Sequence, residues 1–228
     1  MKVPQTLAIL ADNRRRGLSE SQAGVPWSKT PWKKYFPEHA GFFDNLPNQP
    51  LQRSEILQAC SSADRSPDDA VQAFLAAMAW GYGPIGYGPW RTKRMFDEDS
   101  DAGDRLHQVA RSLISDGSVE AYRLLANSCR LKWLGPAYGT KFLYFCPQAP
   151  DRPPGLILDR LVARWLRQHE VLDLSAAHWS TLTYENYVHA MRSWANELDL
   201  QPGELEEAIF VQAREEARKE LRGRFTDG

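Results

Sequence analysis

The sequence is poor in cysteine and carries no metal-binding pattern. Its 228 residues include an odd number of cysteines, without a CxxC pair: Cys60, Cys129 and Cys146. This count argues against a disulfide framework, a zinc site and a four-cysteine iron–sulfur cluster. The five histidines are scattered without the spacing of metal ligands. We therefore expect neither a metal nor another cofactor.

The sequence also lacks a long apolar run. No stretch reaches the roughly 18 residues that a membrane span needs. The opening segment, MKVPQTLAILADNRRRG, carries its arginines after a short apolar run, which is not the order of a signal peptide. We therefore expect a soluble, cytoplasmic protein without a membrane partner, and we expect it to be a monomer.

Neither sign of charge prevails over the whole chain. The formal net charge is −1, with 43% hydrophobic and 25% charged residues, which fits one globular domain or two lobes and argues against disorder. The average hides a local excess, because residues 121–170 contain eight Lys or Arg against three acidic residues. This segment is a candidate phosphate-facing surface.

Helical patterns begin at residue 66. Ser66-Pro67-Asp68-Asp69 combines a capping side chain, a proline suited to the first helical position and acids in the first turn. Gly117 provides a left-handed stop for a helix over residues 106–114. Apolar spacing predicts further helices at 118–127, 158–165, 184–198 and 205–212. No alternating strand appears after residue 66, so we predict a mainly α-helical fold.

The first 65 residues differ in composition from the rest. They are rich in Pro, Trp and Phe and show weak periodicity. We therefore predict two parts, an irregular N-terminal lobe over 1–65 and a helical core with C-terminal helices over 66–228.

The segment LKWLGPAYGTKFLYFC, residues 131–146, carries the most informative pattern. We predict a tight turn containing Gly135, Pro136 and Gly139 between two helices. Backbone N–H groups at the start of the second helix would then bind a phosphate without reading base sequence. Lys141 would lie in the first turn of that helix, and Asp159 follows 18 residues later at the start of another helix.

These residues resemble the helix-hairpin-helix DNA glycosylases, and most closely their 8-oxoguanine DNA glycosylase-like branch. In that family a hairpin of the form L-P-G-V-G-T-K ends in a catalytic lysine, and an aspartate follows some eighteen to twenty residues later. GPAYGTK reproduces the proline, the second glycine, the threonine and the lysine. Ala137 replaces the usual first glycine and Tyr138 a small aliphatic residue. The match is specific over residues 119–166, plausible from residue 66, and absent over the N-terminal lobe.

The resemblance implies a two-lobed helix-hairpin-helix glycosylase fold with the active site between the lobes. Lys141 and Asp159 would be its catalytic pair. A carboxylate beneath the deoxyribose stabilises the oxocarbenium-like transition state of N-glycosidic cleavage. A neutral lysine can attack C1′ and form a Schiff base. Desolvation favours the neutral amine whereas Asp159 favours the ammonium, so the sequence leaves the charge state and any lyase activity open.

The resemblance also implies a set of DNA-binding positions. The hairpin would contact phosphates through Lys132, Gly135, Ala137, Gly139 and Thr140.

The glycine-rich segment AWGYGPIGYGPWRTKRM, residues 79–95, follows the helix that starts at residue 66. In the family this position carries the loop that enters the minor groove, where Tyr82 and Tyr87 would stack and Arg91 would hold a phosphate or the orphaned base. The alternative is a rigid loop packed on the core. Phe145, one helical turn beyond Lys141, is the candidate wall of a base pocket.

The predicted function is therefore excision of a modified base from double-stranded DNA. Bacterial members of this compact branch include anti-phage enzymes that excise glucosylated hydroxymethylcytosine from phage DNA, and we rank that role ahead of housekeeping repair of 8-oxoguanine. A helix-hairpin-helix subunit that binds DNA without cleaving it is the non-enzymatic alternative. An unrelated helical interaction protein would show no salt-dependent DNA binding.

Overall fold

A computed structural model describes residues 2–175 and 177–226. Within that part of the chain the regular structure is helical, with twelve α-helices and one short 3-10 helix. The one β-pairing among these residues is an isolated bridge between Val25 and Leu51. The mainly α-helical fold predicted from the periodicity is confirmed.

The chain divides into two compact units, Gly24–Ile157 and Met1–Ala23 with Leu158–Gly228. This division differs from the expected boundary at residue 65. The physical reason is that the first helix, α1 (Gln5–Arg15), packs its apolar side on the last helix, α12 (Pro202–Thr226). The Arg14 guanidinium also lies 3.3 Å from the Glu207 carboxylate.

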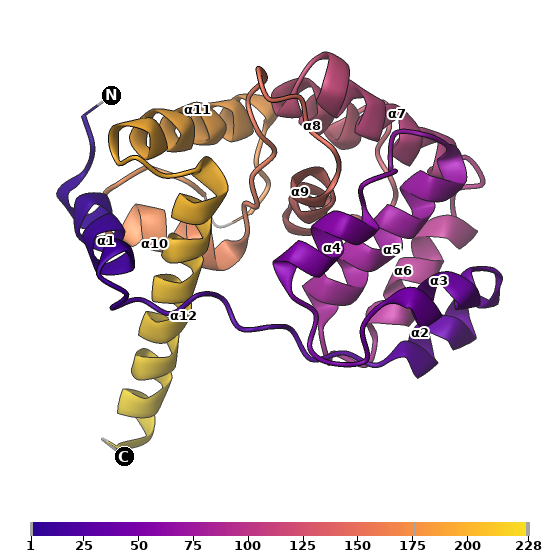
Figure 1. The fold of residues 1–228 in the computed structure, drawn as a ribbon, viewed down its shortest axis with the longest axis horizontal. Helices are drawn as coiled ribbons and strands as arrows, with labels where there is room; N and C mark the ends of the chain where they lie inside the picture. The colour runs from indigo at the N-terminus through magenta and orange to yellow at the C-terminus, as the bar shows by residue number, and fades with distance from the viewer. Residues whose placement is uncertain (1, 176, 227–228) are drawn as a thin grey trace. The chain divides into compact units, whose positions relative to one another are not determined.

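The unit Gly24–Ile157 is built around α5 (Pro67–Tyr82), which packs against α4 (Arg53–Ala59), α6 (Gly88–Asp97), α7 (Ala102–Ser115) and α9 (Pro136–Phe145). Figure 1 shows α9 beside α5 within this unit. The predicted start of α5 is confirmed, because the Ser66 hydroxyl accepts a hydrogen bond from the Asp69 N–H at 3.1 Å. Between α7 and α8 (Ser118–Ala126), Gly117 adopts the predicted positive φ, +91°.

The segment expected to be irregular contains short helices instead. They are α2 (Lys29–Tyr35), the 3-10 helix η1 (Pro37–His39), α3 (Ala40–Asn45) and α4. Each is too short to show a clear apolar period, and α2 and α3 are held by tertiary aromatic contacts. The Trp32 ring lies 6.3 Å from Phe36 and 5.9 Å from Phe43, centroid to centroid.

The other unit contains α1, α10 (Arg160–Gln168), α11 (Thr181–Glu197) and α12. Helices α1, α10 and α11 all pack against α12, and in Figure 1 α12 runs beside α10 and α1. Glu216 on α12 joins α10 by accepting hydrogen bonds from Trp165 Nε1 at 3.2 Å and from His169 Nε2 at 3.0 Å. This clamp fixes the helix that begins directly after Asp159.

Candidate active site

Helix α9 begins earlier than predicted. Gly135 is its N-cap and Pro136 its first residue, a position that suits proline because the first N–H of a helix has no intrahelical acceptor. Gly139 is therefore inside the helix and not in the turn, and Lys141 lies in the second helical turn and not in the first. The N–H groups of Tyr138 and Gly139 both donate to the Gly135 carbonyl, at 3.1 and 3.0 Å. These two amides thus already have a partner at this helix start.

Gly139 has a packing role inside α9. A Cβ at this position would lie 2.8 Å from Leu125 Cδ2 on α8, which is closer than carbon atoms normally approach. The missing side chain therefore lets α8 and α9 pack closely. The neighbouring Thr140 is buried, and its hydroxyl donates to the Ala137 carbonyl at 3.2 Å.

Lys141 is nearly buried, with 8% of its surface exposed. Its Nζ donates to the Ala137 carbonyl at 3.3 Å and lies 5.5 Å from the centroid of the Tyr138 ring. Gly81 on α5 makes room for the lysine stem, because a Cβ there would lie 3.0 Å from Lys141 Cδ. Lysine is rarely buried to this extent, so its location fits a reactive amine better than a solvated surface charge.

The loop after α5 is shorter than the glycine-rich segment predicts. Helix α5 continues to Tyr82 and α6 starts at Gly88, so only residues 83–87 lie outside helices, and Arg91 is an exposed residue of α6. Tyr87 is 53% exposed, as a stacking role requires.

The solvent-facing position expected for Tyr82 is wrong. Tyr82 is 3% exposed, and its ring stacks on Tyr138 at 4.3 Å between centroids. Burial is the largest effect on its phenol and raises the pKa to about 12. Its hydroxyl has no hydrogen-bond partner among the described residues. Tyr82 is therefore a buried packing residue that holds Tyr138 and, through it, helix α9.

Phe145 lies in the core of its unit, with 1% of its surface exposed. Its ring meets Trp80 edge to face at 5.1 Å and Tyr144 at 5.0 Å. Contact between Phe145 and an extruded base stays a prediction.

Asp159 is the N-cap of α10, as predicted. Its Oδ1 accepts hydrogen bonds from the N–H groups of Leu161 at 3.0 Å and Val162 at 3.1 Å. The carboxylate therefore lies at the positive end of the helix dipole and has its orientation fixed. Asp159 belongs to the unit that includes α10, whereas Lys141 belongs to the unit that includes α9.

A nearly buried lysine and a helix-capping aspartate are thus the chemically distinctive groups of this segment. A family model described as "Putative 8-oxoguanine DNA glycosylase OGG-like protein" matches residues 19–210. The chain belongs to this OGG-like family. Searches of curated proteins and of solved structures found no match. Membership indicates a DNA glycosylase, with DNA as its partner.

In the OGG-like protein the hairpin residue Lys132 lies beside the C-terminal end of α6. Lys132 is largely exposed, and its Nζ forms an ion pair with Glu98 at 2.7 Å. Gly135 and Ala137 are half-buried at the start of α9. Among the described residues there is no group of three or more potential metal ligands and no helix long and apolar enough to cross a membrane.

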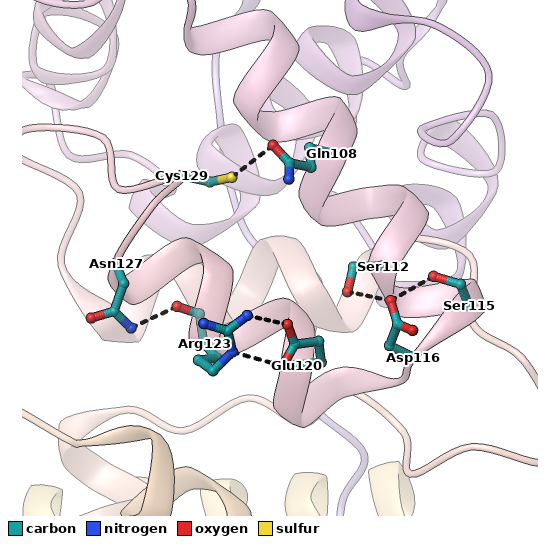
Figure 2. A network of polar contacts seen from close by, with 8 residues as sticks. All are labelled: Gln108, Ser112, Ser115, Asp116, Glu120, Arg123, Asn127 and Cys129. Carbon is teal, nitrogen blue, oxygen red and sulfur yellow. Dashed lines mark hydrogen bonds and ion pairs between the residues drawn. The ribbon is translucent and has the colours of Figure 1, made fainter.

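Sequence reasoning missed a polar network on α7 and α8 of the OGG-like protein (Figure 2). Asp116 accepts hydrogen bonds from the Ser115 hydroxyl at 2.7 Å and the Ser112 hydroxyl at 3.1 Å, which lower the pKa of its carboxyl. At the C-terminal end of α8, the Asn127 side chain donates to the Arg123 carbonyl at 2.7 Å. These contacts hold the C-terminal ends of α7 and of α8, the helix that precedes the hairpin. The sequence does contain a pattern that could have predicted the Asp116 contacts, because Ser112, Ser115 and Asp116 are spaced to lie on one face of a helix.

Proposed function

We propose that the protein is a DNA glycosylase that extrudes a modified base from duplex DNA and cleaves its N-glycosidic bond, leaving an abasic site. The observation that carries the proposal is the family match over residues 19–210, which includes both members of the expected catalytic pair. The near-complete burial of Lys141 and the fixed carboxylate of Asp159 support it.

Asp159 would stabilise the positive charge that develops on the deoxyribose as the bond between C1′ and the base breaks. One carboxylate oxygen already accepts two backbone hydrogen bonds, so the group needs little reorganisation when the charge appears. Preorganised charges of this kind commonly account for the largest part of catalysis.

Lys141 would attack C1′ through its Nζ when the amine is neutral. Burial between α5 and α9 keeps water away from the lysine stem, and Nζ donates a hydrogen bond to the Ala137 carbonyl. The neutral amine is the form that can act as a nucleophile. If Nζ displaces the base at C1′ and loses a proton, opening of the C1′–O4′ bond gives a Schiff base, which permits strand cleavage by a lyase step.

The α8–α9 hairpin would bind the DNA backbone. Lys132 and the residues of the α9 start, Gly135, Ala137, Gly139 and Thr140, form this candidate contact, with Arg91 on α6 as a further cation. Tyr87 is the exposed tyrosine available for stacking at the extruded base. Phosphate contacts position the duplex and carry no base preference.

For the substrate we propose glucosylated hydroxymethylcytosine in phage DNA, which would make the enzyme an anti-phage defence protein. The support for this substrate is the resemblance to the compact anti-phage branch. The residues before α5 also bring aromatic and polar side chains together, and Trp27, Lys29, Lys33, Asp44 and Asn48 line a surface cavity of about 370 Å³. Repair of 8-oxoguanine is the second candidate, favoured by the description of the family.

The test is the mass detection of free bases released from several DNA preparations, including modified phage DNA, unmodified DNA and an 8-oxoguanine duplex. Release of any base with formation of abasic sites supports the glycosylase. Salt-dependent DNA binding without release of any base supports the non-catalytic binding protein instead.

A further inference from the structure

Two tryptophans are exposed on one surface of the unit Gly24–Ile157. Trp90 on α6 is 48% exposed and Trp133 in the hairpin is 40% exposed. The Arg94 guanidinium lies over both rings, at 3.9 Å from the Trp133 ring centroid and 5.7 Å from that of Trp90. Lys132 Nζ lies 5.5 Å from the Trp133 ring. We call Trp90, Arg94, Lys132 and Trp133 the aromatic–cation platform.

The platform is held in place by more than these ring contacts. The Glu98 carboxylate accepts side-chain hydrogen bonds from Lys132 and Trp133, which lower its pKa, so one acid fixes two platform residues. Trp133 also has a φ of +72°, which bulky side chains seldom adopt. The surrounding structure thus maintains an unfavourable backbone conformation that presents an indole to solvent. Strain of this kind gathers at ligand-binding positions.

The flat rings and the cations of the platform indicate which kind of ligand it binds. Flat indole faces stack on flat rings, and every nucleobase has such a face. Arg94 and Lys132 place two cations beside the indole rings, so the surface also suits the phosphates beside a stacked base. Bases inside a duplex are stacked on each other and cannot reach such a surface, whereas bases of a single strand can.

We propose that the aromatic–cation platform is a binding site for single-stranded DNA. An unpaired base stacks on the exposed indole faces, while Lys132 and Arg94 contact the adjoining phosphates. This activity goes beyond the proposed base excision, because it requires neither Lys141 nor Asp159.

The experiment measures binding of the full chain to a fluorescent oligodeoxythymidylate of about 20 nucleotides, which has no base pairing of its own. We expect the double variant Trp90→Ala/Trp133→Ala to bind about tenfold more weakly or worse, since loss of one stacked base alone commonly costs fivefold or more. Trp133→Phe, which keeps an aromatic face, should stay within about threefold of the wild type. The matched control is Ile114→Ala, which removes a 38% exposed apolar side chain on α7 and should leave the affinity unchanged.

Two further measurements separate the roles of the platform residues. The Trp variants should leave the salt dependence of binding unchanged, whereas Lys132→Ala should reduce the slope of log affinity against log salt by about 0.7. If the double variant is unfolded, Trp90→Ala alone replaces it, because Trp90 lies on the exposed side of α6. Duplex DNA of the same length should be bound by the Trp variants almost as well as by the wild type.

Wild-type affinity of the double variant for the single strand would overturn the proposal. An equal loss for single-stranded and duplex DNA would also overturn it, because the tryptophans would then contact the backbone or support the fold. Base release is assayed separately on duplex DNA, so failure of the platform and failure of the glycosylase are distinguishable.

Discussion

At the scale of single residues, Asp159 has two separable roles. It caps α10 through Oδ1, and it is the proposed stabiliser of the sugar cation. Asparagine is as good an N-cap as aspartate, so Asp159→Asn removes the charge while it keeps the cap. We expect base release to fall at least about a hundredfold, equivalent to roughly 2.7 kcal/mol, with an unchanged melting temperature and little change in DNA affinity.

Lys141→Gln provides the matching test of the nucleophile. The glutamine amide can still donate to the Ala137 carbonyl, so the fold should persist while the attacking amine is lost. We expect a loss of base release of at least about a hundredfold, measured as single-turnover excision. Wild-type excision by folded Asp159→Asn or Lys141→Gln protein would contradict the catalytic assignment.

Tyr82 and Tyr87 differ in burial, and this difference predicts opposite behaviour. Tyr82→Ala should lower the free energy of unfolding by about 3–5 kcal/mol, because it empties a site where the ring stacks on Tyr138. Tyr82→Phe removes a buried hydroxyl without a partner and should be neutral or stabilising. Tyr87→Ala should spare stability and weaken excision from duplex DNA. Urea unfolding and excision per folded molecule distinguish these results, and a stable Tyr82→Ala protein would contradict the packing role.

At the scale of elements, Gly155 determines how closely the segment after α9 approaches that helix. A Cβ at Gly155 would lie 2.7 Å from the Leu143 carbonyl oxygen, a backbone atom that cannot turn away. We therefore expect Gly155→Ala to destabilise the protein by about 1–3 kcal/mol in urea unfolding. Gly41→Ala on α3 is the control, because a Cβ there meets nothing within 4 Å and alanine favours a helix. Similar stability of the two variants would contradict the close approach.

The clamp between α10 and α12 predicts a dependence of stability on pH. Burial raises the pKa of Glu216, but hydrogen bonds from Gln212, His169 and Trp165 outweigh it and leave the pKa lower than usual. A carboxyl whose pKa is lowered by folding contributes stability above its unfolded pKa and loses that contribution as pH falls through the folded pKa. Glu216→Gln should therefore destabilise the protein near neutral pH and converge with the wild type in acid. Parallel unfolding curves at all pH values would contradict the clamp.

At the scale of the whole molecule, the features that could be predicted from sequence were the locally encoded ones. Ser66 and Asp159 were placed correctly because a capping side chain bonds to the backbone two or three residues away. The start of α9 differs from the prediction because the pattern places Gly139 in a turn, whereas this glycine is required inside the helix by the neighbouring Leu125 on α8. This contact joins two helices, so no pattern in the sequence around Gly139 reports it.

The same limit explains the rest of the differences. The packing of α1 on α12 joins segments about 190 residues apart, as Arg14 and Glu207 show, and no spacing within the sequence reports it. The family resemblance predicts Tyr82 on a loop that faces DNA, yet α5 continues to this residue and buries it, as the alternative of a segment packed on the core requires. For the candidate site, the sequence predicted which residues to consider. How deeply each is buried, and where each lies in its helix, depended on the tertiary fold.

The substrate is the property that depends on the whole molecule. A glucosylated pyrimidine is larger and more polar than 8-oxoguanine, so its binding requires hydrogen-bonding groups beside aromatic walls. The resemblance to the anti-phage branch favours this substrate, and Tyr138 beside Lys141 is an aromatic side chain near the proposed site. We therefore expect release of glucosyl-hydroxymethylcytosine from phage DNA, with abasic sites that impair phage replication.

Unmodified DNA should be bound but not cut, because the hairpin contacts phosphates without regard to base. The measurement is mass detection of the released base from glucosylated phage DNA, from the same phage DNA without glucose, and from an 8-oxoguanine·cytosine duplex. Efficient release of 8-oxoguanine, with the glucosylated DNA left intact, would contradict the defence role and establish a repair enzyme. Release from the glucosylated DNA alone would show that the sugar is part of what the enzyme recognises, because the three substrates share the same backbone and differ in the modified base.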